Sequence, residues 1–182
     1  MKVAVITGGS KGIGYSVAES LLKQGYCVAI TSRNIENANK AAEKLVAFGD
    51  VLAIEADAKD YQSQQDAINL VIEKWGQIDV LIANAGVGNF ASIEELSIDD
   101  WNETIDTNLT GVFYSIKASL DAIKKTKGYI FTISSLAGTN FFAGGSAYNA
   151  SKFGFTGFTQ AVMLDLRKHG IKVSTIMPGS VA

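Results

Sequence analysis

The chain has 182 residues, of which 47% are hydrophobic and 19% are charged, and its formal net charge is -2. This length suffices for one substantial core but not for two ordinary domains, so we expect a single domain over residues 1–182. A nearly neutral, acidic protein has no electrostatic reason to bind nucleic acid or an anionic membrane. No apolar run reaches the roughly 20 residues that cross a bilayer, which predicts a cytoplasmic protein. Because the chain has only one histidine and one cysteine, we expect no metal site.

Short apolar runs alternate with amphipathic segments along the whole chain. The apolar runs are rich in β-branched residues and apolar nearly throughout, which is typical of strands buried in a parallel sheet. They lie at residues 2–7, 26–31, 51–56, 78–83, 128–134 and 171–177. The amphipathic segments predict helices over residues 12–24, 35–48, 61–75, 99–125, with a break near Thr107, and 146–169.

This alternation predicts an α/β fold of the Rossmann type: a doubly wound parallel sheet of six strands with helices on both faces. In such sheets, ligands bind beyond the carboxyl ends of the strands, where the strand order reverses. Polar and glycine-rich residues follow the predicted strands, so we expect one crevice to collect residues 7–10, 32–34, Asp57, 84–86, 134–135, Pro178 and Gly179.

A glycine-rich turn, TGGSKGIG, joins the first predicted strand to the first predicted helix at residues 7–14. Such a turn lets backbone N–H groups and the helix dipole approach a pyrophosphate. The spacing is neither GxGxxG nor that of a P-loop, because no Gly-Lys-Ser/Thr follows. Taken alone, the turn is also compatible with a purely structural role.

Tyr148 and Lys152 are four positions apart in a predicted helix, and this spacing puts both side chains on one face. A positive charge about 5 Å from a phenol favours its ionised form by about 3 kcal/mol at an effective dielectric near 20. Such a pair can exchange a proton near neutral pH. Taken alone, however, a YxxxK pair is more often a surface pair with an extended lysine.

Several motifs occur together in one order: Gly8, Gly12 and Gly14, then the turn at 84–86, then Ser135 thirteen positions before Tyr148, then Lys152. In this combination the chain resembles the short-chain dehydrogenase/reductase family, and within it the 3-oxoacyl reductases, over essentially residues 7–179. The family's NNAG turn falls on residues 83–86, where Ala83 replaces the first Asn. The resemblance implies a catalytic tetrad of Asn108, Ser135, Tyr148 and Lys152.

The resemblance also implies a role for each member of this tetrad. Tyr148 would donate a proton to the substrate oxygen during reduction, and Ser135 would hydrogen-bond the same oxygen. Lys152 would favour the ionised form of the tyrosine and hold the nicotinamide ribose. Asn108 would bind a water molecule that links Lys152 to solvent. Without the resemblance, Asn108 reads as a residue that caps or kinks a helix.

A nicotinamide dinucleotide is the cofactor that the resemblance implies. A bare ribose is usually held by an acidic residue at the end of the second strand, whereas a 2′-phosphate calls for a cation. Arg33 occupies that place and Lys11 lies in the glycine turn, so we expect NADP(H); the alternative is that both are solvated surface charges. Asp57 would lie against the adenine, unless it is a turn residue. The expected cofactor-binding residues are Thr7, Gly8, Ser10, Lys11, Gly12, Ile13, Gly14, Ser32, Arg33, Asp57, Asn84, Ala85, Gly86, Tyr148, Lys152, Pro178 and Gly179.

We therefore expect an NADP(H)-dependent oxidoreductase that transfers a hydride between nicotinamide and a small-molecule carbonyl or secondary alcohol. The apolar segment 139–144 would form one wall of an apolar substrate pocket, or else a structural loop. Three alternatives stay open: a non-catalytic NADP-binding module, an inactive enzyme fragment, and an isomerase or dehydratase on the same scaffold.

The resemblance has two further implications. Family members continue with a substrate lid and a seventh strand that this sequence lacks, so we expect a truncated chain. Its sixth strand would then be an open edge with the apolar residues Ile171, Val173, Ile176 and Met177 exposed to association. The second implication is a homodimer or homotetramer formed through the helices at 99–125 and 146–169.

Overall fold

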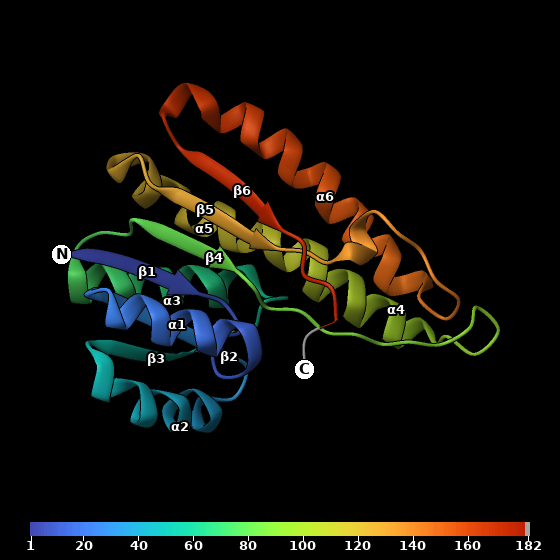
Figure 1. The fold of residues 1–182 in the computed structure, drawn as a ribbon, viewed down its shortest axis with the longest axis horizontal. Helices are drawn as coiled ribbons and strands as arrows, with labels where there is room; N and C mark the ends of the chain where they lie inside the picture. The colour runs from blue at the N-terminus through green and yellow to red at the C-terminus, as the bar shows by residue number, and fades with distance from the viewer. Residues whose placement is uncertain (181–182) are drawn as a thin grey trace.

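The computed structural model describes residues 1–180 and confirms the predicted fold class. Six parallel strands form one sheet in the order β3-β2-β1-β4-β5-β6 (Figure 1). The order reverses between β1 and β4, so a crevice opens at the carboxyl ends of these two strands. The strands are β1 (Lys2–Ile6), β2 (Tyr26–Ser32), β3 (Val51–Glu55), β4 (Val80–Ala83), β5 (Tyr129–Ile133) and β6 (Lys172–Ile176).

Helices cover both faces of this sheet. They are α1 (Gly12–Lys23), α2 (Ile35–Leu45), α3 (Tyr61–Trp75), α4 (Ile98–Ile105), α5 (Gly111–Thr126) and α6 (Ser146–Leu166). Side chains of β1 alternate between two cores: Val3 and Val5 pack with residues of α3, α5 and α6, whereas Ala4 and Ile6 pack with residues of α1 and α2. This alternation, which leaves no polar face on the strand after Lys2, explains why the strand is apolar from Val3 to Ile6.

The predicted break in the helix at 99–125 is present as a π-helical turn, Asp106–Thr110, between α4 and α5. The N–H of Gly111 bonds to the carbonyl of Asp106, five residues earlier. The turn buries two polar residues, Thr107 and Asn108, which are 4% and 0% exposed. Such insertions in helices are frequent at functional sites.

Strand β6 lies at the edge of the described sheet, but the expectation of exposed apolar residues there is wrong for Val173 and for Ile171, which directly precedes the strand. Ile171 and Val173 are buried in the core that includes Phe155 and Leu166 of α6. Ile176 is 49% exposed. Because α6 covers one face of β6, the side chains on that face are removed from water. No helix within residues 1–180 has the length and the apolar character of a membrane span.

Candidate active site

The turn between β1 and α1 presents its backbone to the crevice. Gly8 and Gly12 have φ angles of 64° and 57°, in the region that favours glycine. A Cβ on Gly8 would lie 2.9 Å from the Cα of Ala85, whereas a Cβ on Gly12 would meet no atom within 4 Å. Lys11 caps α1 without a side-chain hydrogen bond. The first N–H groups of α1 therefore open onto free space, an arrangement that suits an anionic group.

Thr7 and Asn84 hold this turn against the end of β4. The Thr7 hydroxyl oxygen accepts hydrogen bonds from the N–H groups of Asn84 and Ala85, at 3.0 and 3.1 Å. The Asn84 side-chain amide donates to the carbonyl oxygens of Thr7 and Gly8, both at 3.0 Å. A Cβ on Gly14 would lie 2.5 Å from Asn84 Nδ2, so this position requires glycine. Thr7, Asn84 and Gly14 thus shape the turn, and their predicted contact with a cofactor stays a prediction.

A cleft of about 700 Å³ opens beside the glycine turn. The structure brings most of the predicted binding residues together there: Gly8, Ser10, Lys11, Gly12, Ile13, Ser32, Arg33, Asn84, Ala85 and Gly86 all line it. The lining does not include Thr7, Gly14, Asp57, Tyr148, Lys152, Pro178 or Gly179. Sequence reasoning missed Asn37, Lys40 and Lys44, although their helical spacing after Arg33 would have placed them on one face of α2.

Thr107 is a further cleft residue that the sequence analysis identified only as the break in a helix. It lines the cleft from the π-helical turn, and its side chain is 4% exposed. Within residues 1–180 its hydroxyl has no hydrogen-bond partner. Buried hydroxyls are nearly always paired, so this one is suited to a polar ligand in the cleft.

Asp57 forms a turn. Its Oδ1 accepts a hydrogen bond from the N–H of Lys59 at 2.9 Å, and its own N–H donates to the Ser63 hydroxyl at 3.0 Å. Its neighbours Ala56 and Ala58 line the cleft. The local geometry agrees with the alternative of a turn residue, and a contact between Asp57 and an adenine stays a prediction.

Ser135 follows β5 and begins the short 3-10 helix η3 (Leu136–Gly138). Its hydroxyl oxygen accepts a hydrogen bond from the N–H of Ala137 at 3.1 Å, which leaves its O–H free to donate. Ser135 is partly exposed, whereas the preceding Ser134 is 5% exposed. The choice of Ser135 over Ser134 from the spacing agrees with this difference.

Tyr148 and Lys152 lie on one face of α6, as their spacing predicted. The Lys152 ammonium is 5.7 Å from the centre of the Tyr148 ring and 5.0 Å from that of Phe155. It donates one hydrogen bond, at 3.3 Å, to the carbonyl oxygen of Ile133. Lys152 is 5% exposed, and this burial lowers its pKa to about 8. Since an ammonium has three N–H donors, two remain for a ligand, which would stabilise the charged form.

Asn108 is fully buried and connects three elements. Its Oδ1 accepts from the N–H of Val87 at 2.8 Å, and its Nδ2 donates to the Val87 carbonyl at 2.9 Å and to the Ser151 hydroxyl at 3.1 Å. The side chain thus joins the π-helical turn to the segment after β4 and to α6. Both of its N–H donors are used, so the predicted water contact, which stays a prediction, is open only to its oxygen atoms.

We expect Asn108→Ala to lower the free energy of unfolding by about 3 kcal/mol, because it removes three hydrogen bonds of about 1 kcal/mol each, two to the partly buried backbone of Val87 and one to Ser151. Urea unfolding followed by circular dichroism measures this loss. Asn102→Ala, an exposed change on α4, is the control and should shift stability by less than about 0.5 kcal/mol. A loss for Asn108→Ala as small as that of the control would contradict the role of Asn108 as a structural link.

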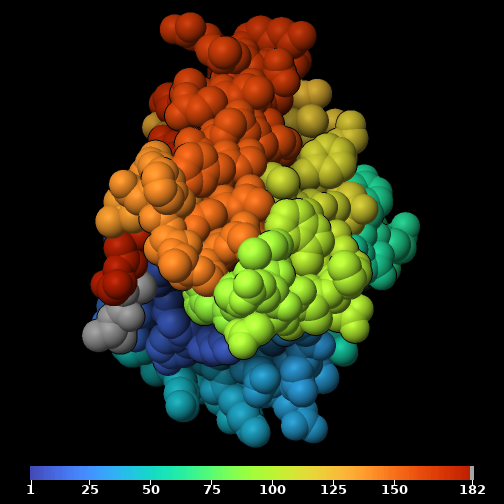
Figure 2. Space-filling view, turned by 90° about the vertical axis from the view of Figure 1, so that its right-hand side faces the viewer, coloured from blue at the N-terminus to red at the C-terminus, as the bar shows by residue number. Residues whose placement is uncertain are grey.

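Tyr148 belongs to a cluster of aromatic side chains. The Phe90 ring lies 5.2 Å from the Tyr148 ring and 5.9 Å from the Phe142 ring. The N–H of Ala91 donates to the carbonyl of Gly144 at 2.9 Å and joins the two loops. Figure 2 shows the segment after β4, in light green, against the start of α6 and its preceding loop, in orange. Phe142 of the segment 139–144 thus lies near Tyr148 with Phe90, which the sequence analysis missed, between them, and the role of this segment as the wall of a substrate pocket stays a prediction.

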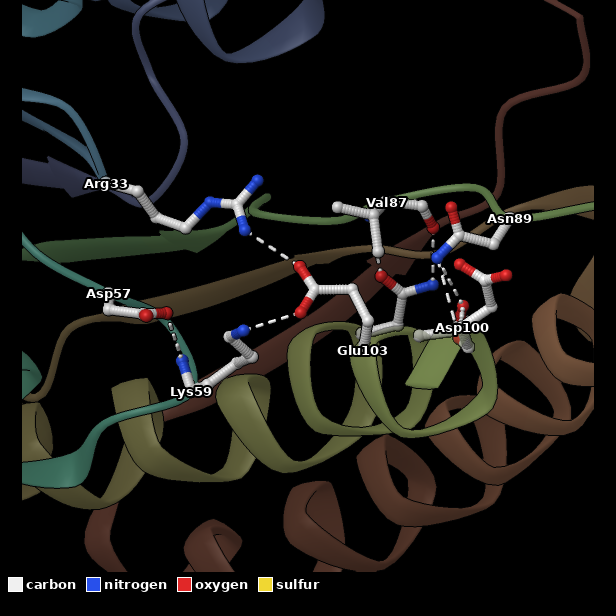
Figure 3. A network of polar contacts seen from close by, with 9 residues as sticks. Arg33, Asp57, Lys59, Val87, Asn89, Asp100 and Glu103 are labelled. Carbon is white, nitrogen blue, oxygen red and sulfur yellow. Dashed lines mark hydrogen bonds and ion pairs between the residues drawn. The ribbon is translucent and has the colours of Figure 1, made fainter. Parts of the chain in front are cut away.

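A network of charges lies at the rim of the cleft (Figure 3). Arg33 Nη1 is 2.8 Å from Glu103 Oε1, and Lys59 Nζ is 2.5 Å from Glu103 Oε2. The hydrogen bond from Lys59 lowers the pKa of Glu103, and the same bond raises the pKa of Lys59. The sequence gives no sign of this network, because Glu103 is 70 positions from Arg33 and 44 from Lys59. Within residues 1–180, no group of three or more His, Cys, Asp or Glu side chains could hold a metal ion.

Comparison with known proteins identifies the family. Residues 2–182 match the family model described as short chain dehydrogenase. The chain is 36% identical over 187 residues to trans-4-hydroxycyclohexanecarboxylate dehydrogenase of Sinomonas cyclohexanicum, an alignment that covers 99% of this chain and 72% of that protein. It is 34% identical over 187 residues to a 3-oxoacyl-acyl-carrier-protein reductase of Synechocystis, covering 100% of this chain and 74% of that protein.

Solved structures of similar fold support the same family assignment. The alcohol dehydrogenase of Thermococcus sibiricus, in complex with 5-hydroxy-NADP, has a TM-score of 0.95 and 32% identity, covering 100% of this chain and 77% of that chain. A metagenomic short-chain oxidoreductase in complex with NADP has a TM-score of 0.92 and 36% identity, covering 100% and 83%. The chain therefore belongs to the short-chain dehydrogenase/reductase family, as its motifs predicted.

Proposed function

We propose that this protein is an NADP(H)-dependent oxidoreductase acting on a carbonyl group or a secondary alcohol. The observation that carries the proposal is the placement of Ser135, Tyr148 and Lys152 at the same end of the sheet as the cleft beside the glycine turn. Family membership supports it, as do the relatives named as dehydrogenases and reductases. Two similar structures were solved with NADP or a derivative of it.

The residues present fit such a cofactor. The open space beside Gly12 and the first N–H groups of α1 would receive the pyrophosphate, and the unpartnered Thr107 hydroxyl would meet a polar group of the ligand. Lys152 would hold ribose hydroxyls through its two remaining N–H donors. Arg33 and Lys11 would bind the 2′-phosphate. When bound, NADP(H) supplies or accepts the hydride.

The protein's own residues would position the substrate and move one proton. In the direction of reduction, the free O–H of Ser135 would hydrogen-bond the substrate carbonyl oxygen and fix it beside Tyr148. The Tyr148 hydroxyl would donate a proton to that oxygen. The charged Lys152 would favour the ionised tyrosine that remains after the transfer. Phe90 and Phe142 would give the substrate an apolar surface beside the tyrosine.

A cofactor and substrate screen tests this proposal. We expect the protein to consume NADPH with some members of a panel of ketones and aldehydes. The reaction is monitored through the decrease in absorbance of the reduced nicotinamide. Binding of NADPH without turnover on any member of the panel would favour a non-catalytic binding module or an inactive fragment. Failure to bind either nicotinamide cofactor would refute the proposal.

The choice of NADPH over NADH makes a separate prediction. We expect Arg33→Ala to raise the KM for NADPH about tenfold to a hundredfold, since a hydrogen bond between charged groups contributes about 1.5–3 kcal/mol. The KM for NADH should change less than about threefold, because NADH has no 2′-phosphate. Steady-state kinetics with both cofactors measures the split. An equal rise in both KM values would contradict the assignment of Arg33.

A homodimer or homotetramer also remains part of the proposal. Phe113 on α5 and Phe153 and Leu164 on α6 are 45%, 44% and 63% exposed. Exposed apolar side chains on these two helices support association through them. The single-domain organisation and the cytoplasmic location stay predictions.

A further inference from the structure

Arg33 forms an ion pair with Glu103 across the crevice at which the strand order reverses. It follows β2, in the half of the sheet formed by β3, β2 and β1, and it lines the cleft. Its partner Glu103 lies on α4, which follows β4 in the other half. The 2.8 Å contact between Arg33 Nη1 and Glu103 Oε1 therefore connects the two sides of the crevice at the rim of the cleft (Figure 3).

Glu103 is itself held by a second cation. Its Oε2 accepts from Lys59 at 2.5 Å, and the backbone of Lys59 is fixed because its N–H donates to Asp57. The carboxylate thus has one cation on each oxygen, and its side chain is only 28% exposed. The hydrogen bond from Lys59 lowers the pKa of Glu103, so Glu103 remains an anion at neutral pH. The two ion pairs set two cations against the carboxylate of Glu103, and the Asp57 carboxylate, whose charge also raises the pKa of Lys59, balances the second cation.

The contact with Glu103 occupies few of the N–H donors of the Arg33 guanidinium. The group has five N–H donors in a rigid plane, and within residues 1–180 only Nη1 donates to another side chain. The Arg33 side chain is 55% exposed, so its other donors remain accessible. A planar group with several free N–H donors can bind two oxygens of a phosphate at once.

We propose that Glu103 is a positioning residue, which holds the Arg33 guanidinium at the rim of the cleft so that its remaining N–H groups receive the 2′-phosphate of NADP(H). This inference rests on the proposed function. An arginine that is already held loses less conformational freedom when the ligand binds than one that moves freely in solvent. Lys59 contributes by offsetting the negative charge that Glu103 brings near the phosphate.

Binding of the adenosine half of the cofactor tests the inference without any catalytic step. Isothermal titration calorimetry on the full chain would compare adenosine 2′,5′-bisphosphate with adenosine 5′-monophosphate, which lacks the 2′-phosphate. For Glu103→Ala we expect the Kd of the bisphosphate to rise about fivefold, the effect of releasing one long side chain. The Kd of the monophosphate should change less than about twofold. Glu103→Gln keeps an oxygen for Arg33 and should retain most of the affinity for the bisphosphate.

Two further variants separate positioning from general effects of charge. Asp99→Ala removes a carboxylate from the same helix, one that forms no ion pair within residues 1–180, and should leave both Kd values unchanged. In the Arg33→Ala background, Glu103→Ala should have no further effect on the bisphosphate, because Glu103 acts through Arg33.

The outcomes distinguish this inference from the proposed function. If the wild type does not prefer the bisphosphate and Arg33→Ala changes nothing, the assignment of NADP(H) fails. If Arg33→Ala weakens bisphosphate binding and Glu103→Ala does not, only the role of Glu103 fails. Tighter binding by Glu103→Ala would show that Glu103 competes with the phosphate, and equal weakening for both nucleotides would show a general structural role. Each of these two results overturns the inference.

Discussion

Tyr148→Phe is expected to lower kcat about a thousandfold while NADPH binds with unchanged affinity. The substitution removes the proton donor, and general acid catalysis by a positioned side chain contributes about 10²- to 10⁴-fold. The ring remains, so the packing of Tyr148 against Phe90 at 5.2 Å is kept and the local structure should not change. Steady-state kinetics with NADPH and an active carbonyl substrate gives kcat, and the fluorescence of bound NADPH gives the Kd.

The matched control for this variant is Tyr61→Phe. Tyr61 lies on α3 and donates to Gln65 at 3.2 Å on the protein surface. Loss of that hydroxyl should leave kcat unchanged. Turnover of Tyr148→Phe close to that of Tyr61→Phe would remove Tyr148 from the chemistry and require another proton donor.

Lys152→Met is expected to abolish turnover and, at the same time, to stabilise the fold by about 2 kcal/mol at neutral pH. Burial lowers the pKa of Lys152 from 10.5 to about 8, so keeping the charge in the native protein costs about 3 kcal/mol. Methionine removes that cost and forfeits about 1 kcal/mol for the hydrogen bond to Ile133. The melting temperature should rise by about 5 °C.

The stability difference between Lys152→Met and the wild type should depend on pH in a defined direction. Because the native pKa of Lys152 is lowered, the unfolded chain binds more protons between about pH 8 and 10.5. The destabilisation is full below about pH 8 and disappears as the pH approaches 10.5, so the stability advantage of Lys152→Met should shrink over this window. Urea unfolding of both proteins at several pH values measures it. A variant that is less stable at neutral pH, or an advantage independent of pH, would contradict this account of a buried charge.

Features encoded by neighbouring residues could be predicted from the sequence. The strands follow from apolar runs, the glycine turn from its spacing, and the interruption near Thr107 from a change in the helical pattern. The common face of Tyr148 and Lys152 follows from helical geometry alone. These features depend on local backbone preferences, which a short stretch of sequence records.

Features that depend on contacts between distant segments could not be predicted. Glu103 meets Arg33 only because α4 crosses beside the end of β2, and Phe90 meets Tyr148 only because two loops are joined by a backbone hydrogen bond. The depth at which Lys152 is buried is likewise a property of the packed structure. The expectation for Ile171 and Val173 was wrong because a strand sequence does not say whether a helix covers one of its faces.

The π-helical turn at Asp106–Thr110 restricts how the length of this chain can vary. Deleting one of its residues would restore a regular α-helix and leave helix propensity almost untouched. Because a π turn holds one residue more than an α turn, the helices on both sides would keep their orientation, and the change would fall on the turn itself. Asn108 would then lose the backbone position from which its side chain contacts Val87 and Ser151. Among related sequences, gaps in this five-residue stretch should therefore be far rarer than in the loops on either side of the helical segment.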